Sequence, residues 1–340
     1  MNYDVLGLGG LIIDHILLAS SQFLEEIQIE KGGWRSVDYK TLQEIIERSR
    51  AVPSTVPGGS AANTIKGLAR LGHKAGLIGK IGRDEMGDFY LNAMRKRGVA
   101  IQEIPSDNPT AQLIALVTPD GQRTFCIFQG ASVELSGADL HPDHFAGTKL
   151  VHIEGYTLFN GDLTERAMSL AKRSGAIVSF DLASFEIVRR FKQEIYQLLN
   201  TYVDIVFCNE DEAKMLTDHT EEETAEILGS ICDIAIISLG SRGCYIQQGN
   251  TRFHSPAYFV PSPLDTTGAG DLFASGFLHG YLHKKPLEEC ARFGAMMGAS
   301  VIQVSGGEIP EKRWKKICKS IKDGTPFIIQ KAASLVGTTP

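Results

Sequence analysis

Residues 265–271 read Asp-Thr-Thr-Gly-Ala-Gly-Asp and run directly into an apolar helical pattern. Glycines at a helix start leave the first backbone N–H groups accessible, and these groups together with the helix dipole favour an anion. Phosphoryl transfer needs such a site because negative charge spreads over the transferred oxygens. The segment could therefore hold an anion at the helix start, or its glycines could merely allow close packing.

The carboxylate of Asp271 follows this turn and falls in the first turn of the predicted helix. From there it could accept the proton of an attacking hydroxyl group, a role that typically contributes about 10²–10⁴ in rate. An aspartate at this place could equally stabilise the helix dipole without doing chemistry. Taken by itself, the pattern leaves both interpretations open.

Two segments could bind a polyhydroxylated acceptor. Residues 58–63 read Gly-Gly-Ser-Ala-Ala-Asn, where paired glycines allow a ligand close to the backbone and Asn63 offers a donor and an acceptor. The same segment could be a simple helix start with Ser60 as its N-cap. Asp14 follows the first predicted strand and could bind two vicinal hydroxyls, or lie in an ordinary turn.

Asn209 and Glu212 directly follow a predicted strand, and ligands of open α/β sheets bind at the carboxyl ends of strands. Their spacing places both side chains on one face of a helix start, where they could orient water around Mg²⁺. An ordinary acidic first helical turn would have the same appearance. The loop 238–243 follows another strand and could run under a nucleotide or merely turn the chain.

The elements that must position these residues alternate between strand and helix from about residue 148, which predicts β-α-β units and a mostly parallel sheet with helices on both faces. The segments 15–57 and 105–130 fit poorly as layers of that sheet, and we expect them to form a small β lid. The predicted strands are 3–9, 75–81, 150–153, 177–181, 203–208 and 234–239, the hairpins 112–129 and 243–253, and the helices 39–49, 60–72, 86–97, 162–173, 191–200, 221–230, 271–281 and 287–303.

The composition is that of an ordinary globular protein, with 43% hydrophobic and 22% charged residues among 340. A net charge of −6 without a long basic run argues against a nucleic-acid partner. The six cysteines include no C-x-x-C pair, and no apolar run approaches about 18 residues, which favours a cytoplasmic protein with reduced thiols and no membrane span. The sequence lacks a Walker A motif, and its early glycines lack the third glycine of a dinucleotide fingerprint.

Three segments, 58–63, 209–212 and 265–271, occur in the order typical of the ribokinase-like (PfkB) carbohydrate kinase family, which the chain resembles from Tyr3 to Glu311. Residues 31–33, 119–124 and 294–310 make it most similar to the adenosine-kinase branch. The resemblance implies a ribokinase-like α/β fold with a small β lid and a single kinase domain over residues 1–335. The sequence after Lys331 itself predicts a flexible tail at 331–340.

The resemblance also implies a role for each residue and a set of cofactors. Asp271 would be the base, and the N–H groups of Gly268, Ala269 and Gly270 would form the anion hole. ATP with Mg²⁺ would supply the phosphoryl group, and a K⁺ site near Asp265 stays open. The implied acceptor-binding residues are Asp14, Trp34, Gly59, Ser60 and Asn63, the implied ATP-binding residues are Arg123, Asn209, Ser238, Gly240, Gly243 and Thr266, and Glu212 would hold Mg²⁺ through water.

These residues lead us to expect phosphorylation of the 5′-hydroxymethyl group of a nucleoside, with adenosine converted to AMP. The alternative is a sugar kinase of the same family acting on ribose, fructose or a related sugar. A ligand-binding regulator without catalysis is disfavoured because Asp271 and the turn 268–270 are all present. We expect only small-molecule partners, in a monomer or in a homodimer paired through an exposed edge of the lid.

Overall fold

The computed structural model describes residues 2–304, 308–325 and 327. Its larger sheet consists of β1 (Val5–Leu8), β5 (Ala75–Gly82), β6 (Val99–Ser106), β9 (Leu150–Glu154), β10 (Ile177–Asp181), β11 (Ile205–Asn209), β12 (Ile234–Ser238), β13 (Cys244–Gln248) and β14 (Thr251–Ser255). Their spatial order is β14-β13-β12-β11-β10-β9-β1-β5-β6, and all pairs are parallel except those of the terminal β13–β14 hairpin. The predicted mostly parallel sheet is confirmed.

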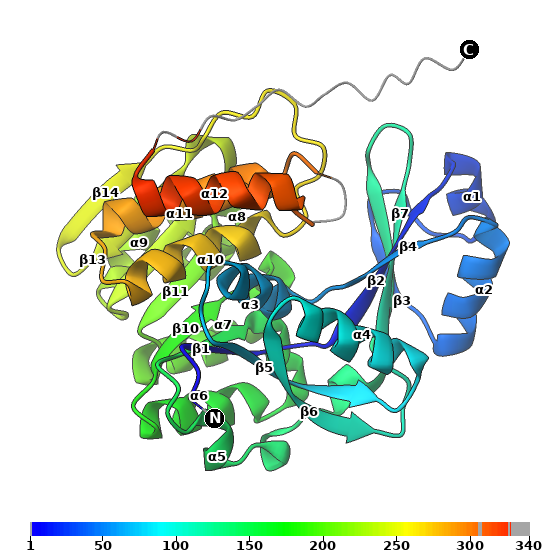
Figure 1. Ribbon diagram of the computed structural model, residues 1–340, viewed down its shortest axis with the longest axis horizontal. Helices are drawn as coiled ribbons and strands as arrows, with labels where there is room; N and C mark the ends of the chain where they lie inside the picture. The colour runs from blue at the N-terminus through cyan, green and yellow to red at the C-terminus, as the bar shows by residue number, and fades with distance from the viewer. Residues whose placement is uncertain (1, 305–307, 326, 328–340) are drawn as a thin grey trace.

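Helices cover both faces of this sheet (Figure 1). Strand residues alternate between the two faces, so that Val5 packs in one hydrophobic cluster and Leu6 and Leu8 pack in the other. On one face lie α5 (Pro142–Phe145), α6 (Leu163–Arg173), α7 (Phe185–Thr201), α8 (Glu210–Thr217) and α9 (Glu221–Gly229); on the other lie α3 (Ser60–Arg70), α4 (Glu85–Lys96), α10 (Ala269–Leu282) and α11 (Leu287–Val301), with α12 (Glu311–Asp323) packed on α11. Short 3₁₀ turns occur at η1 (Gly130–Glu134), η2 (Gly137–Asp139), η3 (Gly155–Asn160) and η4 (Gly240–Arg242).

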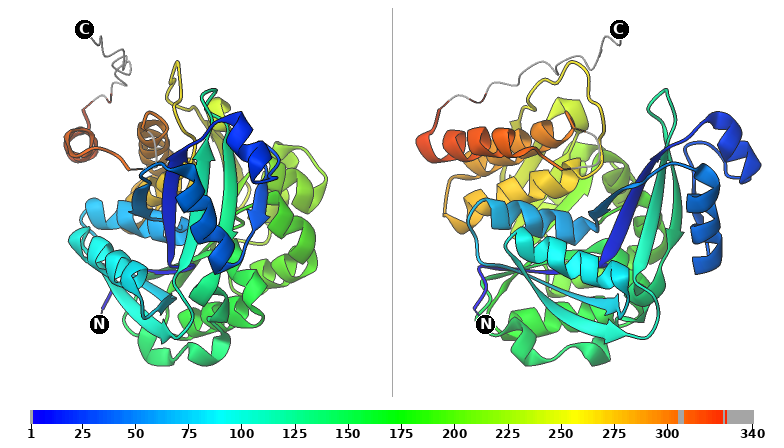
Figure 2. Two further views of the ribbon diagram at one scale, coloured as in Figure 1. Left: turned by 90° about the vertical axis from the view of Figure 1, so that its right-hand side faces the viewer. Right: turned by 45° about the vertical axis from the view of Figure 1, so that its right-hand side comes forward.

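The predicted lid is a second sheet with its own hydrophobic core. Its strands are β2 (Ile12–Leu18), β3 (Trp34–Ser36), β4 (Ser54–Pro57), β7 (Ala111–Val117) and β8 (Arg123–Phe128), in the order β3-β8-β7-β2-β4. The helices α1 (Ser21–Glu26) and α2 (Tyr39–Ser49) cover the side of this sheet that faces away from the main sheet (Figure 2). The opposite side is therefore left facing the carboxyl ends of the parallel strands.

Several boundaries differ from the sequence-based expectation. The region after Asp14, expected to be irregular, is strand β2, in which one set of alternate residues is buried and the other is half-buried or exposed. The lid therefore begins at Ile12 rather than residue 15, and residues 105 and 106 belong to β6 of the main sheet. Helix α7 starts at Phe185 and is kinked at Phe191, so the predicted helix 191–200 corresponds to its second half.

Elements absent from the prediction include β6, α1, α5 and α12, whereas α8 begins at the helix start expected at 209–212. The predicted tail 331–340 lies outside the described residues. Within the described residues, no helix combines the length and the apolar character needed to cross a bilayer.

Candidate active site

The carboxylate of Asp271 is held by the N-terminus of α3. Its Oδ1 accepts a hydrogen bond from Ser60 Oγ at 2.7 Å, and its Oδ2 accepts one from Asn63 Nδ2 at 2.8 Å. Thr64 Oγ1 donates to the backbone carbonyl of Asp271 at 3.1 Å, which fixes the first turn of α10 as well. Each carboxylate oxygen keeps a second lone pair, so the group can still accept a proton.

The surroundings of Asp271 shift its pKa in two opposite directions. Burial raises the pKa of Asp271 above its usual value, while the hydrogen bonds from Asn63 and Ser60 and the charge on Lys66 lower it. A carboxylate with a raised pKa is a better proton acceptor, provided that it stays ionised. The expected role of Ser60 as N-cap is wrong: Gly59 occupies that position, and Ser60 is the first helical residue.

The turn before Asp271 is shaped for a close approach. Gly268 is the N-cap of α10 with φ of 73°, a left-handed conformation that favours glycine. A Cβ atom added to Gly270 would meet no other atom within 4 Å, so the space beside the helix start is open. The N–H group of Ala269 donates to the carbonyl of Thr266 at 3.1 Å, and Thr266 itself is exposed. The helix start therefore offers an open place for an anion, whereas the predicted contribution of Ala269 would require that bond to open.

Asp14 projects from the lid toward the same region. It lies in β2 and is half-buried, and a Cβ atom added to Gly58 would lie 2.2 Å from its Oδ2. Burial raises the pKa of Asp14 to about 7, and the charge of Asp271 adds to this rise. Asp14 and Asp271 are thus two electrostatically coupled carboxylates, one from the lid and one from the main domain.

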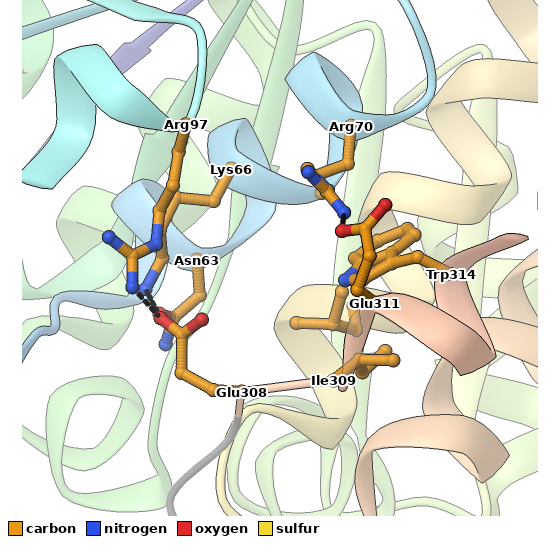
Figure 3. Close-up of a pocket in the computed structure, with 10 residues that line it drawn as sticks. Asn63, Lys66, Arg70, Arg97, Glu308, Ile309, Glu311 and Trp314 are labelled. Carbon is orange, nitrogen blue, oxygen red and sulfur yellow. Dashed lines mark hydrogen bonds and ion pairs between the residues drawn. The ribbon is translucent and has the colours of Figure 1, made fainter.

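A partly buried cation that the sequence analysis missed, Lys66, acts electrostatically on both carboxylates. Lys66 Nζ donates to the carbonyl of Pro57 at 2.6 Å and lies 3.5 Å from Glu308 Oε1, and Arg97 donates to the same oxygen at 3.1 Å. Figure 3 shows Lys66 and Arg97 converging on Glu308. The adjoining cavity of about 180 Å³ is smaller than the roughly 300–1,000 Å³ of most small-molecule sites, so we assign no substrate to it.

The charge on Lys66 lowers the pKa of Asp14 and of Asp271, which favours their ionised forms. The signal for this residue was in the sequence: Lys66 follows Asn63 by three positions in a helix whose neighbouring residues are apolar. Its partner Glu308 could not be inferred, because 242 positions separate the two.

A second missed residue is Glu154, at the carboxyl end of β9. Its Oε1 accepts from the N–H of Gly10 at 2.8 Å and its Oε2 from the N–H of Ala61 at 2.7 Å. It therefore links the carboxyl end of β1 to the start of α3. In the sheet, β5 and β6 follow on one side of β1, and β9 and β10 follow on the other. Ligands of open α/β sheets bind at such a reversal of strand order. Burial raises the pKa of Glu154 to about 7. The position of Glu154 directly after the predicted strand 150–153 was the feature of the sequence from which this residue could have been found.

Asn209 and Glu212 form a capping box at the start of α8. Asn209 Oδ1 accepts from the N–H of Glu212 at 2.9 Å, and both Glu212 oxygens accept from Asn209, at 2.7 and 2.9 Å. Burial raises the pKa of Glu212 to about 7. Asp181, at the end of the neighbouring β10, has its pKa raised well above the usual value by burial and by the charges of Glu212 and Asp271. Three mutually repelling carboxylates thus lie near the ends of β10 and β11 and the start of α10.

Arg123 reaches from β8 of the lid to the loop before α10. It forms an ion pair with Asp265, which is buried, and donates to Thr267 Oγ1 at 2.6 Å. Asp265 Oδ1 also accepts from the N–H of Thr267 at 2.9 Å. The guanidinium of Arg123 thus contacts Asp265, the carboxylate near which the sequence analysis left a K⁺ site open. The phosphate contact of Arg123 and the K⁺ site both stay predictions.

The remaining predicted residues fall into two groups. Ser238 lies beside Asn209 in the register of β11 and β12, and Gly240 and Gly243 follow in the adjoining turn, so this part of the predicted nucleotide site is contiguous. Trp34 is 60% exposed in β3, three strand positions from β2, which is roughly 14 Å at the usual strand spacing. The structure does not bring Trp34 to Asp14, and its contact with an acceptor stays a prediction.

The pfkB family carbohydrate kinase model matches residues 41–314, which is most of the chain. The protein belongs to the PfkB family. It is 30% identical over 264 residues to the 5-dehydro-2-deoxygluconokinase of Clostridium perfringens, with 72% of this chain and 78% of that protein covered.

Two solved structures are similar over nearly the whole chain. A probable sugar kinase protein from Rhizobium etli is 33% identical, with a TM-score of 0.85 and coverage of 95% of this chain and 99% of that one. The adenosine kinase from Sinorhizobium meliloti is 32% identical, with a TM-score of 0.85 and coverage of 96% and 100%. The ribokinase-like fold and the family resemblance are therefore confirmed, and the protein is a PfkB kinase for a sugar or a nucleoside.

Kinases of the PfkB family use ATP, generally with Mg²⁺, and the residues present fit both. The open helix start at Gly270 suits phosphate oxygens. The carboxylates of Asp181 and Glu212, which are buried close to further negative charge, form an oxygen-rich environment of the kind that hydrated Mg²⁺ prefers. Mg²⁺ bound with ATP would neutralise phosphate charge there.

Gly59 of this PfkB site gives a test of the local geometry. Its φ is 98°, and an added Cβ atom would lie 2.4 Å from the carbonyl oxygen of Gly10. We expect Gly59→Ala to lower the free energy of unfolding by at least about 1–3 kcal/mol, the usual cost of backbone strain. Denaturant unfolding would measure this change. Gly98→Ala is the matched control, because Gly98 has φ of 80° and no neighbouring atom within 4 Å. Equal losses in the two variants would contradict the predicted clash.

Proposed function

We propose that the protein transfers the γ-phosphoryl group of ATP to the 5′-hydroxyl group of adenosine. The observation that carries the proposal is the pair of coupled carboxylates, Asp14 on the lid and Asp271 at the start of α10. A furanose carries two vicinal hydroxyls, which one carboxylate can bind, and one hydroxymethyl group, which the other carboxylate can deprotonate. The likeness to an adenosine kinase across 96% of the chain favours a nucleoside.

In the proposed reaction Asp14 binds the two ring hydroxyls and so directs the 5′-hydroxyl toward Asp271. Asp271, held by Ser60 and Asn63, accepts the 5′-hydroxyl proton as the new O–P bond forms. The bond between the γ-phosphorus and the bridging oxygen breaks, and ADP leaves with that oxygen. The N–H groups at the start of α10 stabilise the charge on the transferred oxygens.

The second candidate is a sugar kinase. Two similarities favour it: the relative named 5-dehydro-2-deoxygluconokinase and the probable sugar kinase structure. The distance of the exposed Trp34 from β2 also means that no aromatic ring of β3 lies against Asp14 to stack on a base. The chemistry at Asp271 would be the same, and only the acceptor would differ.

A screen of ADP formation separates these candidates. Purified protein would be assayed with ATP, Mg²⁺ and adenosine, inosine, cytidine, ribose, fructose or 5-dehydro-2-deoxygluconate, and the phosphorylated product identified by mass spectrometry. We expect the highest kcat/KM with adenosine. Turnover with sugars and none with nucleosides would refute the proposal and support the second candidate. The Asp271→Asn protein, prepared identically, controls for contaminating kinases.

A further inference from the structure

Three histidine side chains gather at the end of α10 that lies away from the active site. His279 lies on α10, His283 is its C-cap four residues later, and His73 lies in the turn after α3. Their ring centroids are 5.0, 5.2 and 4.4 Å apart. Among the residues that the structure describes, this is the one group of three or more His, Cys, Asp or Glu side chains whose possible ligand atoms all lie within 4.8 Å of one another.

The three rings take part in two hydrogen bonds, and one ring nitrogen of His283 takes part in neither. His73 Nε2 and His279 Nδ1 are 2.9 Å apart and share one proton, while His283 Nδ1 donates to the carbonyl of His279 at 2.9 Å. That bond leaves His283 Nε2 available on an exposed ring, which can rotate. Two histidines at positions i and i+4 of a helix end, joined by one from a neighbouring turn, make a common arrangement for binding Zn²⁺.

We propose that His73, His279 and His283 bind one Zn²⁺ ion, with water as the fourth ligand. Zinc–nitrogen bonds of about 2.0–2.1 Å require the ring nitrogens to lie within about 4 Å of one another, so the exposed His283 must move inward by a small amount. Zinc replaces the proton shared by His73 and His279, and that proton moves to the other nitrogen of the ring that carried it. Binding therefore needs no oxidant and releases no net proton from this pair.

The protonation states and the neighbouring charges of His73 and His279 are compatible with a bound cation. Burial lowers the pKa of His279 to about 3 and that of His73 to about 4, so both rings are neutral and keep a lone pair at neutral pH. The charged groups that act on them are Asp4, Lys149 and Lys285. Lys149 forms an ion pair with Asp4 at 2.8 Å, and Lys285 lies 3.5 Å from Glu289.

The position of the cluster indicates a structural role. Helices α3 and α10 carry Ser60 and Asp271 at their N-terminal ends, and the histidines join the opposite ends of the same two helices. Asp271 and His279 are eight residues apart on α10, or about 12 Å along the helix axis. Zinc would thus hold the two helices together without touching the reacting atoms, independently of which acceptor the kinase uses.

Equilibrium binding of Zn²⁺ to the full chain tests the site, with excess Mg²⁺ present to occupy oxygen ligands and a chromogenic chelator as competitor. We expect one Zn²⁺ per chain and a rise in Tm on binding. His283→Ala should weaken the affinity at least about 100-fold, since even the loss of an outer partner of a metal ligand typically costs 10–100-fold. His283 is the ligand to change because it is exposed, whereas removing His73 would leave His279 without its partner.

His219→Ala is the matched control, because His219 is an exposed histidine outside the cluster. It should bind Zn²⁺ with the affinity of the unaltered protein, and His283→Ala should keep normal kinase activity. Equal Zn²⁺ affinity in His283→Ala and the unaltered protein would overturn the proposal. So would NMR signals of the three rings that do not move on addition of one equivalent of Zn²⁺.

Discussion

Replacement of Asp271 by asparagine is expected to lower kcat by about 10²–10⁴-fold, the usual contribution of a general base. Asparagine preserves the shape of the side chain and can still accept from Ser60 or Asn63, but its amide does not take up a proton. The dissociation constant of the acceptor should change little, because Asp14 remains. Steady-state kinetics and acceptor binding by calorimetry would measure the two quantities.

Asp211→Asn is the control for this variant. Asp211 is also an acidic residue in the first turn of a helix, but it is exposed on α8. If Asp271 merely favoured the helix dipole, the two substitutions would have similarly small effects on kcat. A kcat of Asp271→Asn close to that of the unaltered protein would remove the residue from the role of base.

Asp14→Asn is expected to raise KM for the acceptor by about 10–100-fold for each hydroxyl that the carboxylate binds, because a hydrogen bond to a charged group is worth about 1.5–3 kcal/mol. KM for ATP should stay within experimental error, since Asp14 lies on β2 of the lid sheet, whereas the predicted nucleotide turn η4 follows β12 of the main sheet. Initial rates with each substrate varied in turn would separate the two constants. Equal increases in both would refute the assignment of Asp14 to the acceptor.

The raised pKa of Asp14 adds a pH dependence to this prediction. The value of about 7 means that the group becomes protonated as the pH falls through 7, so its charge is lost on the acid side. We therefore expect KM for the acceptor to rise between pH 7 and pH 6. Glu154 and Glu212 also have pKa values raised to about 7, so the test is whether Asp14→Asn abolishes this rise.

Local patterns in the sequence predicted much of the fold. The structure contains the predicted strand–helix alternation after residue 148, the hairpin 112–129 and the helix 39–49. The patterns that predict these elements involve residues close together in the sequence. Strand β2 was missed because Asp14 and His15 interrupt its apolar character. The polar ring of His15 is satisfied by Gln112 and Thr55, which lie on two other strands.

The candidate site was less predictable, because its residues are distant in the chain. The sequence located Asp271 and the segment 58–63, but not that Ser60 and Asn63 donate to Asp271. Nor did it reveal the network of Lys66, Arg97 and Glu308, whose members come from three separate segments. Charge pairing of this kind depends on the completed packing and leaves no periodic trace in the sequence.

The bond between Ser60 and Asp271 spans 211 positions of the chain. A ribosome that adds about 5–20 residues per second needs roughly 10–40 s to synthesise that stretch. During this interval α3 is already made, but the carboxylate that its Ser60 and Asn63 hold does not yet exist. Phosphoryl transfer would thus begin only after Asp271 has emerged, so a nascent chain that stalls or ends before this residue would not spend cellular ATP.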